Sequence, residues 1–104
     1  MRLLDLVVNE YVSIVETLLE GESVENNRII IDKGYFKVLL EKYHYMKFDQ
    51  KTKIYKALNF IFHDKNNYTL PCKDAETKKT VRKVVFNYNA YLTVKKLLET
   101  EATL

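Results

Sequence analysis

The chain has 104 residues, of which 47% are hydrophobic and 12% are aromatic. This composition is enough to bury one modest core, so we expect a single domain over residues 1–104. It also excludes a disordered chain, which would lack large apolar side chains. No apolar run approaches the roughly 18 residues that a membrane helix needs, so a membrane span is also excluded. The formal net charge of +3 hides an asymmetry, because residues 1–26 hold one basic side chain against six acidic ones, whereas residues 33–83 hold thirteen basic against five acidic. This distribution favours a polyanionic partner for the middle of the chain, although lysines that only keep a small domain in solution would give the same pattern.

The first segment predicts an amphipathic helix over residues 3–20, with Gly21 as its stop signal. Its apolar positions recur with helical spacing and form one seam with a second row beside it. The seam contains Leu4, Val8, Tyr11, Val15 and Leu18, and the second row contains Leu3, Val7 and Ile14. This apolar surface is wider than one stripe, so the surplus is available to a second subunit.

A short strand and a second helix are predicted after the polar stretch ESVENN. The β-branched run RIII predicts the strand over residues 28–31. The helix is predicted over YFKVLLEKYHY, residues 35–45, because four apolar side chains there have the i, i+3, i+4, i+7 spacing. These side chains are Phe36, Leu39, Leu40 and Tyr43.

A third helix is predicted over QKTKIYKALNFIF, residues 50–62, with Asp49 as its N-cap because a carboxylate there can accept hydrogen bonds from free backbone amides. The core spacing places Ile54, Ala57, Leu58 and Ile61 on one face. The opposite face is polar and basic and has no carboxylate, which suits nucleic acid; an ordinary solvated face would more usually include Glu or Asp. That face carries Thr52, Lys56, Asn59 and His63, flanked by Lys53, Tyr55 and Phe60.

Residues 68–88, YTLPCKDAETKKTVRKVVFNY, predict a β-hairpin after the turn HDKNN. YTLPC and TVRKVVFNY are the strands, KDAETKK is the loop, and Leu70, Val84 and Phe86 supply a face for the core. Basic side chains at the tip and along its flank can lie over phosphates or enter a minor groove. These cations are Lys73, Lys78, Lys79, Arg82 and Lys83. An ordinary solvated hairpin is the alternative, because Asp74 and Glu76 dilute the charge.

A final helix is predicted over AYLTVKKLLETEA, residues 90–102, with Tyr91, Val94, Leu97 and Leu98 as its apolar set. The elements then follow the order helix, short strand, two helices, two-stranded wing and C-terminal helix, which is the order of a winged helix-turn-helix in the α+β class. In that fold the wing pairs with the short strand. Double-stranded DNA is favoured over RNA, because the aromatics do not form the paired strand motifs of a stacking platform. We expect DNA contacts from Gln50, Thr52, Lys53, Lys56, Asn59, His63, Lys73, Lys78, Lys79 and Arg82.

Catalysis has little support in the sequence. Paired carboxylates, a Ser-His-Asp arrangement, a Gly-rich phosphate loop and metal-ligand spacing are all missing from it. Cys72 is the only cysteine, which excludes an intramolecular disulfide and favours a reducing, cytoplasmic setting. His44 and His63 lie in separate segments and are expected at the surface or its boundary. We therefore expect no enzyme, no metal, no cofactor and no small-molecule substrate.

The stretches DQKTKIYKALNFIF and NNYTLPCKDAETKKTVRKVVFNYNAYLTVKKLL resemble the small winged helix-turn-helix proteins of mobile elements. The bias towards Lys, Asn, Ile and Tyr resembles that of low-GC Gram-positive sources. Within that group the chain is similar to the relaxosome accessory proteins of clostridial conjugative plasmids. The resemblance implies a homodimer that binds double-stranded DNA at an origin of transfer and assists a relaxase or coupling protein there. It also implies that the wing and nearby loops are as important for DNA contact as the recognition helix.

Two other functions fit the same residues. A transcriptional regulator of a mobile element would also bind a repeated site as a dimer, and a protein-interaction adaptor would use the same fold with its lysines merely solvated. For a dimer, the first and final helices are the expected interface. The residues expected there are Tyr11, Val15, Leu18 and Leu97, and packing inside their own subunit is the alternative for each.

Overall fold

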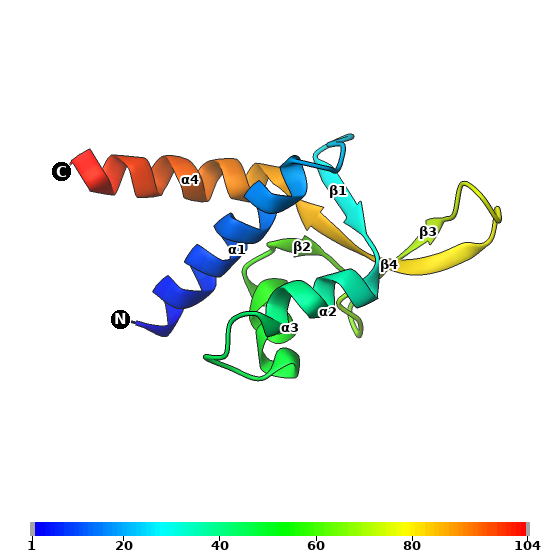
Figure 1. The fold of residues 1–104 in the computed structure, drawn as a ribbon, viewed down its shortest axis with the longest axis horizontal. Coiled ribbons are helices and arrows are strands. Elements are labelled where there is room, and N and C mark those ends of the chain that lie inside the picture. Colours follow the sequence, from blue (N-terminus) through cyan, green and yellow to red (C-terminus); the bar gives the residue numbers. More distant parts are fainter. Residues whose placement is uncertain (1, 104) are drawn as a thin grey trace.

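The computed structural model describes residues 2–103 and belongs to the α+β class, as expected from the sequence. Within that range, four helices accompany a small antiparallel sheet (Figure 1). The helices are α1 (Leu3–Leu19), α2 (Lys33–Glu41), α3 (Phe48–Ala57) and α4 (Tyr88–Thr103). The strands are β1 (Arg28–Ile31), β2 (Ile61–Phe62), β3 (Leu70–Lys73) and β4 (Thr80–Asn87). The predicted first helix, short strand, hairpin and final helix are confirmed to within a few residues.

Strand β4 organises the sheet because its two halves have different partners. Its inner half lies between β1 and β2, where Phe86 is opposite Ile29 on one side and Ile61 on the other. Its outer half pairs with β3, from Leu70 opposite Lys83 to Lys73 opposite Thr80. The predicted pairing of the short strand with the hairpin is confirmed. Strand β2 is not predicted by the sequence, because its two residues lie at the end of the predicted third helix.

The core lies between the inner face of this sheet and the helices α1, α2 and α3. Tyr11 is at its centre: its ring stacks on Phe60 with centroids 3.8 Å apart, and its hydroxyl donates to the backbone oxygen of Asn87 at 2.5 Å. The expected interface residues Tyr11, Val15 and Leu18 are at most 1% exposed. They pack inside their own chain, so the alternative interpretation holds for these three and their assignment to a subunit interface is wrong.

The second and third helices are shorter than predicted. Helix α2 ends at Glu41, and Tyr43 lies in the following turn with 38% of its surface exposed, so its assignment to a helical core face is wrong. Asp49 is not the N-cap of α3, because Lys47 occupies that position and Asp49 lies in the first turn. A carboxylate in the first turn still interacts favourably with the positive end of the helix.

Helix α3 stops at Ala57 because Asn59 adopts a left-handed backbone conformation, with φ of 56°. The amide of Asn59 donates to the oxygen of Lys56, and the amide of Phe60 donates to that of Tyr55. This pair of bonds is a Schellman motif, in which Asn stands where Gly is more common. The chain then turns into β2, so Ile61 reaches the core from a strand rather than from a helix.

The predicted core face of α3 is also wrong. Ala57 and Leu58 are exposed and Ile54 is half-buried, whereas the buried side chains of the helix are Lys51, Thr52 and Tyr55. The helix is therefore rotated relative to the prediction, and part of its polar side faces the protein interior.

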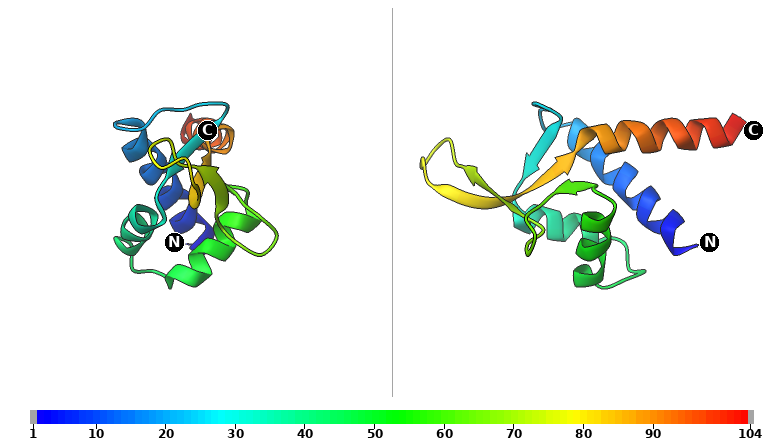
Figure 2. Two further views of the ribbon diagram at one scale, coloured as in Figure 1. Left: turned by 90° about the vertical axis from the view of Figure 1, so that its right-hand side faces the viewer. Right: turned by 180° about the vertical axis from the view of Figure 1, so that it is seen from behind.

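The molecule is elongated, with extents of 49 × 27 × 24 Å. The outer part of the hairpin, residues 70–83, extends from one end, and we call it the hairpin arm. Helix α4 projects from the opposite end, as the right-hand view in Figure 2 also shows. These two extensions present side chains that the core does not use.

Candidate nucleic-acid interface

The hairpin arm carries three exposed lysines, Lys73, Lys78 and Lys79, close to its tip. Beyond its pairing with β4, strand β3 has no other strand beside it among the described residues. The arm thus stands clear of the body, with Lys73 at the end of β3 and the other two lysines in the loop (Figure 1). Among residues 2–103, no carboxylate lies within ion-pair distance of these three ammonium groups. Their charge is therefore directed at solvent.

The tip has a defined shape, which hydrogen bonds of Asp74 maintain. The amide of Asp74 donates to the oxygen of Lys79, and the amide of Lys78 donates to the oxygen of Asp74, both at 2.8 Å. The carboxylate of Asp74 accepts from the amide of Glu76 at 3.0 Å, and this bond lowers the pKa of Asp74 below its ordinary value. Lys78 has a positive φ of 60°. Of the two acids that dilute the charge of the tip, Asp74 thus has a structural role in the turn.

Arg82 differs from these lysines because its guanidinium is occupied within the chain. It donates to the hydroxyl of Thr69 at 2.9 Å and to the backbone oxygen of Thr69 at 2.7 Å, and it forms an ion pair with Asp64. The arm is thereby fastened to the loop that precedes β3. Arg82, expected as a DNA contact, is engaged at the base of the arm.

Lys83 is similarly engaged, with its ammonium 3.1 Å from a carboxylate oxygen of Asp32. The hydrogen bond to Asp32 raises the pKa of Lys83 above its ordinary value. The expected row of five cations thus divides into three that face solvent and two that brace the arm.

The residues expected on the third helix are dispersed by the fold. Gln50 and Lys53 are exposed on α3, and Lys56 is half-buried. Thr52 is only 7% exposed, and its hydroxyl donates to the backbone oxygen of Asp49 at 2.9 Å, so it is not available for reading bases. Asn59 and His63 lie beyond the helix and line a separate hollow of about 330 Å³ beside Asn87. The single recognition face expected on this helix is therefore not formed.

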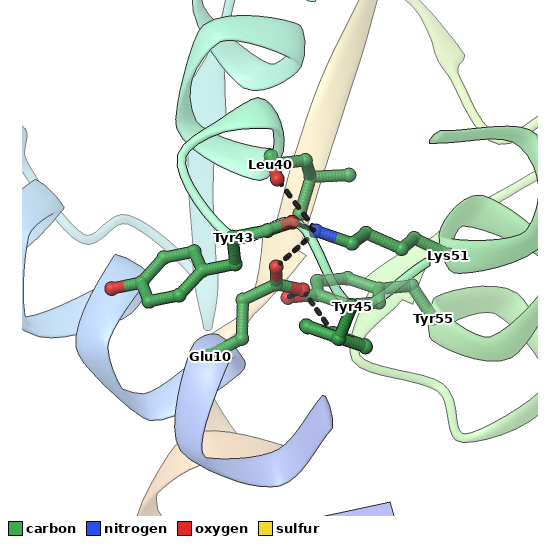
Figure 3. A network of polar contacts seen from close by, with 6 residues as sticks. All are labelled: Glu10, Leu40, Tyr43, Tyr45, Lys51 and Tyr55. Carbon is green, nitrogen blue, oxygen red and sulfur yellow. Dashed lines mark hydrogen bonds and ion pairs between the residues drawn. The ribbon is translucent and has the colours of Figure 1, made fainter. Parts of the chain in front are cut away.

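A buried polar network that the sequence did not reveal lies on the inner side of α3 (Figure 3). The ammonium of Lys51 donates to Glu10 at 2.7 Å and to the backbone oxygens of Leu40 and Tyr43 at 2.6 and 2.5 Å. The same carboxylate accepts hydrogen bonds from the hydroxyls of Tyr45 and Tyr55, each at 2.8 Å. Helix α1, the end of α2, the turn and α3 therefore meet at one ion pair.

Burial raises the pKa of the Tyr55 hydroxyl well above its ordinary value, and the Glu10 carboxylate raises it further. The same two causes raise the pKa of Tyr45. Both hydroxyls therefore stay protonated and act as donors to Glu10. The only sequence signal for this network was a helical position, Glu10, at which an acid interrupts an apolar row.

An apolar groove lies between α1 and α4, which diverge towards the two termini (Figure 1). Its hollow measures about 280 Å³ and is lined mostly by aliphatic side chains, together with Asp5 and Glu101. The aliphatic residues are Leu4, Val8, Val94, Leu97 and Leu98. Leu97, the fourth residue expected at a subunit interface, is 63% exposed. A groove of this kind is available for contact with a protein.

The described residues offer neither a membrane span nor a metal site. No helix in that part of the chain is long and apolar enough to span a membrane, and no cluster of three or more His, Cys, Asp or Glu is placed to hold a metal ion. Cys72 is a half-buried free thiol in β3. In comparisons with known proteins, no family model matches the chain and no curated protein matches it.

Proposed function

We propose that this protein binds double-stranded DNA through the hairpin arm, without catalysing a reaction. The observation that carries the proposal is the set of three solvent-directed lysines, Lys73, Lys78 and Lys79, on an arm that stands clear of the body. Exposed lysines on a projecting element neutralise phosphates and release counterions, which is the main source of affinity in such complexes. The arm is also held at its base by the ion pairs of Arg82 and Lys83.

Two kinds of contact are expected in the complex. The lysines of the arm contact phosphates and set affinity, whereas Gln50 has the amide group that can read base edges. Lys53 is exposed about one helical turn beyond Gln50 and adds charge on the same element. Because the expected recognition face is dispersed, the arm contributes more of the binding free energy than α3 does.

The biological setting that we propose follows the resemblance to winged helix-turn-helix accessory proteins of the TcpK type. In that setting the protein is a cytoplasmic homodimer at an origin of transfer on a conjugative plasmid, where it assists relaxosome assembly by a relaxase or coupling protein. A transcriptional regulator of a mobile element remains the related alternative, since it would bind DNA with the same residues.

The groove between α1 and α4 favours a second candidate function, that of a protein-interaction adaptor. Its aliphatic lining and the 63% exposure of Leu97 fit contact with a second copy of the chain or with another protein. For the dimer we propose this groove as the interface in place of the buried residues of α1. Substitution of Leu97 by Asp would then shift the mass measured by light scattering from dimer to monomer.

The experiment that tests DNA binding uses the purified protein and labelled duplex fragments from the DNA that surrounds its gene, at low and high salt. We expect saturable binding to one fragment that weakens steeply as salt is raised. Failure to bind every fragment at low salt would reject the proposal and leave the adaptor as the better account. Binding that is unaffected by salt would also contradict it, because phosphate contacts release counterions.

A further inference from the structure

The turn between α2 and α3, residues 42–47, contains neither Gly nor Pro, the residues that most often shape a tight turn. Its shape is instead determined from inside the protein. Tyr43 offers its backbone oxygen to the ammonium of Lys51, and Tyr45 donates its hydroxyl to the carboxylate of Glu10. The turn is therefore attached to α1 and α3 at two points by a buried ion pair (Figure 3).

The network around this ion pair is saturated. The three hydrogens of the Lys51 ammonium correspond to three acceptors, and the Glu10 carboxylate accepts from Lys51 and two tyrosines. Within the described part of the chain, no buried side-chain nitrogen or oxygen lacks a partner. Because a polar group without a partner is costly in a low-dielectric interior, a saturated network of this kind permits only one arrangement of the elements it joins.

The same turn determines where α3 begins. Lys47 is the N-cap, and its backbone oxygen accepts from the amides of Gln50 and Lys51. Lys51 is therefore held at two points. Its side chain belongs to the network, and its backbone amide donates to Lys47 in the first turn of the helix. The exposed side chains of Gln50 and Lys53 lie on the outer side of that helix.

We infer that Glu10, Lys51 and Tyr45 are positioning residues, which hold the turn and α3 in one orientation and thereby set how Gln50 and Lys53 meet a duplex. The last step rests on the proposed DNA binding, whereas the ordering of the turn does not. A buried ion pair is often no more stabilising than an apolar pair of the same volume, so conformational specificity is the role that distinguishes it.

Hydrogen exchange of three backbone amides tests the ordering of the turn directly. The amides are those of Tyr43, Gln50 and Lys51, which donate to the oxygens of Leu40 and Lys47. Tyr45→Phe loses one hydrogen bond of the network, and Glu10→Gln/Lys51→Met loses the three of the Lys51 ammonium. In both variants we expect the three amides to exchange at least about tenfold faster. Core amides of β4 keep their protection, which separates local loosening from global destabilisation.

The matched control is Tyr35→Phe, which removes the hydroxyl of a tyrosine that is 42% exposed on α2. It should leave all three exchange rates unchanged. Wild-type exchange rates in both network variants, with core protection intact, would overturn the inference. If the double variant does not fold, Tyr45→Phe alone decides, because it keeps the ion pair and removes only the hydroxyl in the turn.

The preference for one duplex over another tests whether the network sets how Gln50 and Lys53 meet DNA. We expect the network variants to lose about tenfold in preference for the specific fragment over a random duplex, while the slope of log affinity against log salt stays at its wild-type value. That combination indicates unchanged phosphate contacts with misplaced base-reading side chains. An unchanged preference in variants with a loosened turn would overturn the functional step. If the wild-type protein binds no duplex, the proposed function fails, and the exchange rates still decide whether the three residues hold the turn.

Discussion

Lys51 and Lys78 belong to the same basic stretch of the sequence but have opposite environments. Lys51 is 1% exposed, and its ammonium has three acceptors inside the protein. Lys78 is exposed at the tip of the hairpin arm, with its backbone held in a left-handed conformation by the turn. The comparison teaches that a count of lysines does not measure the charge available to a partner. Part of the basic stretch holds the fold together, and another part is free to bind.

The same comparison explains part of the charge asymmetry along the chain. Glu10 and Glu16, from the acidic first segment, pair with Lys51 and Lys95 in later segments. Two cations at the base of the arm, Arg82 and Lys83, pair with Asp64 and Asp32. Part of the charge asymmetry along the sequence is therefore neutralised by ion pairs within the folded protein.

The largest expected effect is on stability and comes from Lys51→Met. Removal of one partner of a buried ion pair costs about 3–5 kcal/mol, because the other charge remains buried without compensation. Urea unfolding measures the change, with Lys53→Met as the matched control two residues along the same helix. A change in Lys51→Met as small as that of the control would show that the network does not constrain the fold.

The second effect is on DNA affinity and comes from the combined variant Lys73→Gln, Lys78→Gln and Lys79→Gln. Each phosphate that loses its lysine lowers the slope of log affinity against log salt by about 0.9, so we expect a decrease of up to about 2.7 with unchanged stability. Titration of a labelled duplex at several salt concentrations gives the slope. The control is the single substitution Lys96→Gln on α4, at the opposite end of the molecule (Figure 1), and a decrease of about 0.9 there would argue for diffuse attraction instead of an interface.

A smaller effect is expected at Asn59, whose left-handed conformation ends α3. Asn59→Ala should destabilise the protein by about 1 kcal/mol, because a Cβ without a compensating polar group is disfavoured at positive φ. Asn59→Gly should be neutral or slightly stabilising for the same reason. Thermal unfolding of the two variants measures the difference, and equal melting temperatures would refute the role assigned to this residue.

The smallest effect concerns pH and the exposed contact between α1 and α4. Hydrogen bonds from Lys95 and Tyr91 lower the pKa of Glu16 below its ordinary value of 4.5. Its contribution to stability is therefore present above that value and is lost as the pH falls through the lower value of the folded protein. Glu16→Gln should therefore lose less stability than the wild type as the pH falls below 4.5 in low salt. Parallel pH profiles of the two proteins would contradict this assignment.

Local patterns in the sequence predicted much of the fold. Helical spacing located α1 and α4, the run RIII located β1, and two β-prone runs joined by a polar loop located β3 and β4. The end of α3 could not be predicted in this way, because Asn59 fills a position for which Gly is the usual signal. Strand β2, with two residues, is too short to leave a pattern.

The candidate site was only partly predictable, for a physical reason. Exposed lysines at a hairpin tip follow from local sequence, and Lys73, Lys78 and Lys79 lie where they were expected. The burial of Lys51 depends on Glu10, 41 residues away. The engagement of Arg82 depends on Thr69 and Asp64 in the loop before β3, which are 13 and 18 residues away. Polar partners that meet only after folding leave no periodic signal in a single sequence.

Lysine labelling followed by mass spectrometry, with and without the bound duplex, tests the contrast between the two kinds of lysine most directly. We predict that Lys51 resists acylation in the folded protein under both conditions, and that Lys73, Lys78 and Lys79 react in the free protein and become protected by DNA. Ready labelling of Lys51 in the folded protein would contradict the account. So would labelling of Lys73, Lys78 and Lys79 that is the same with saturating duplex as without it.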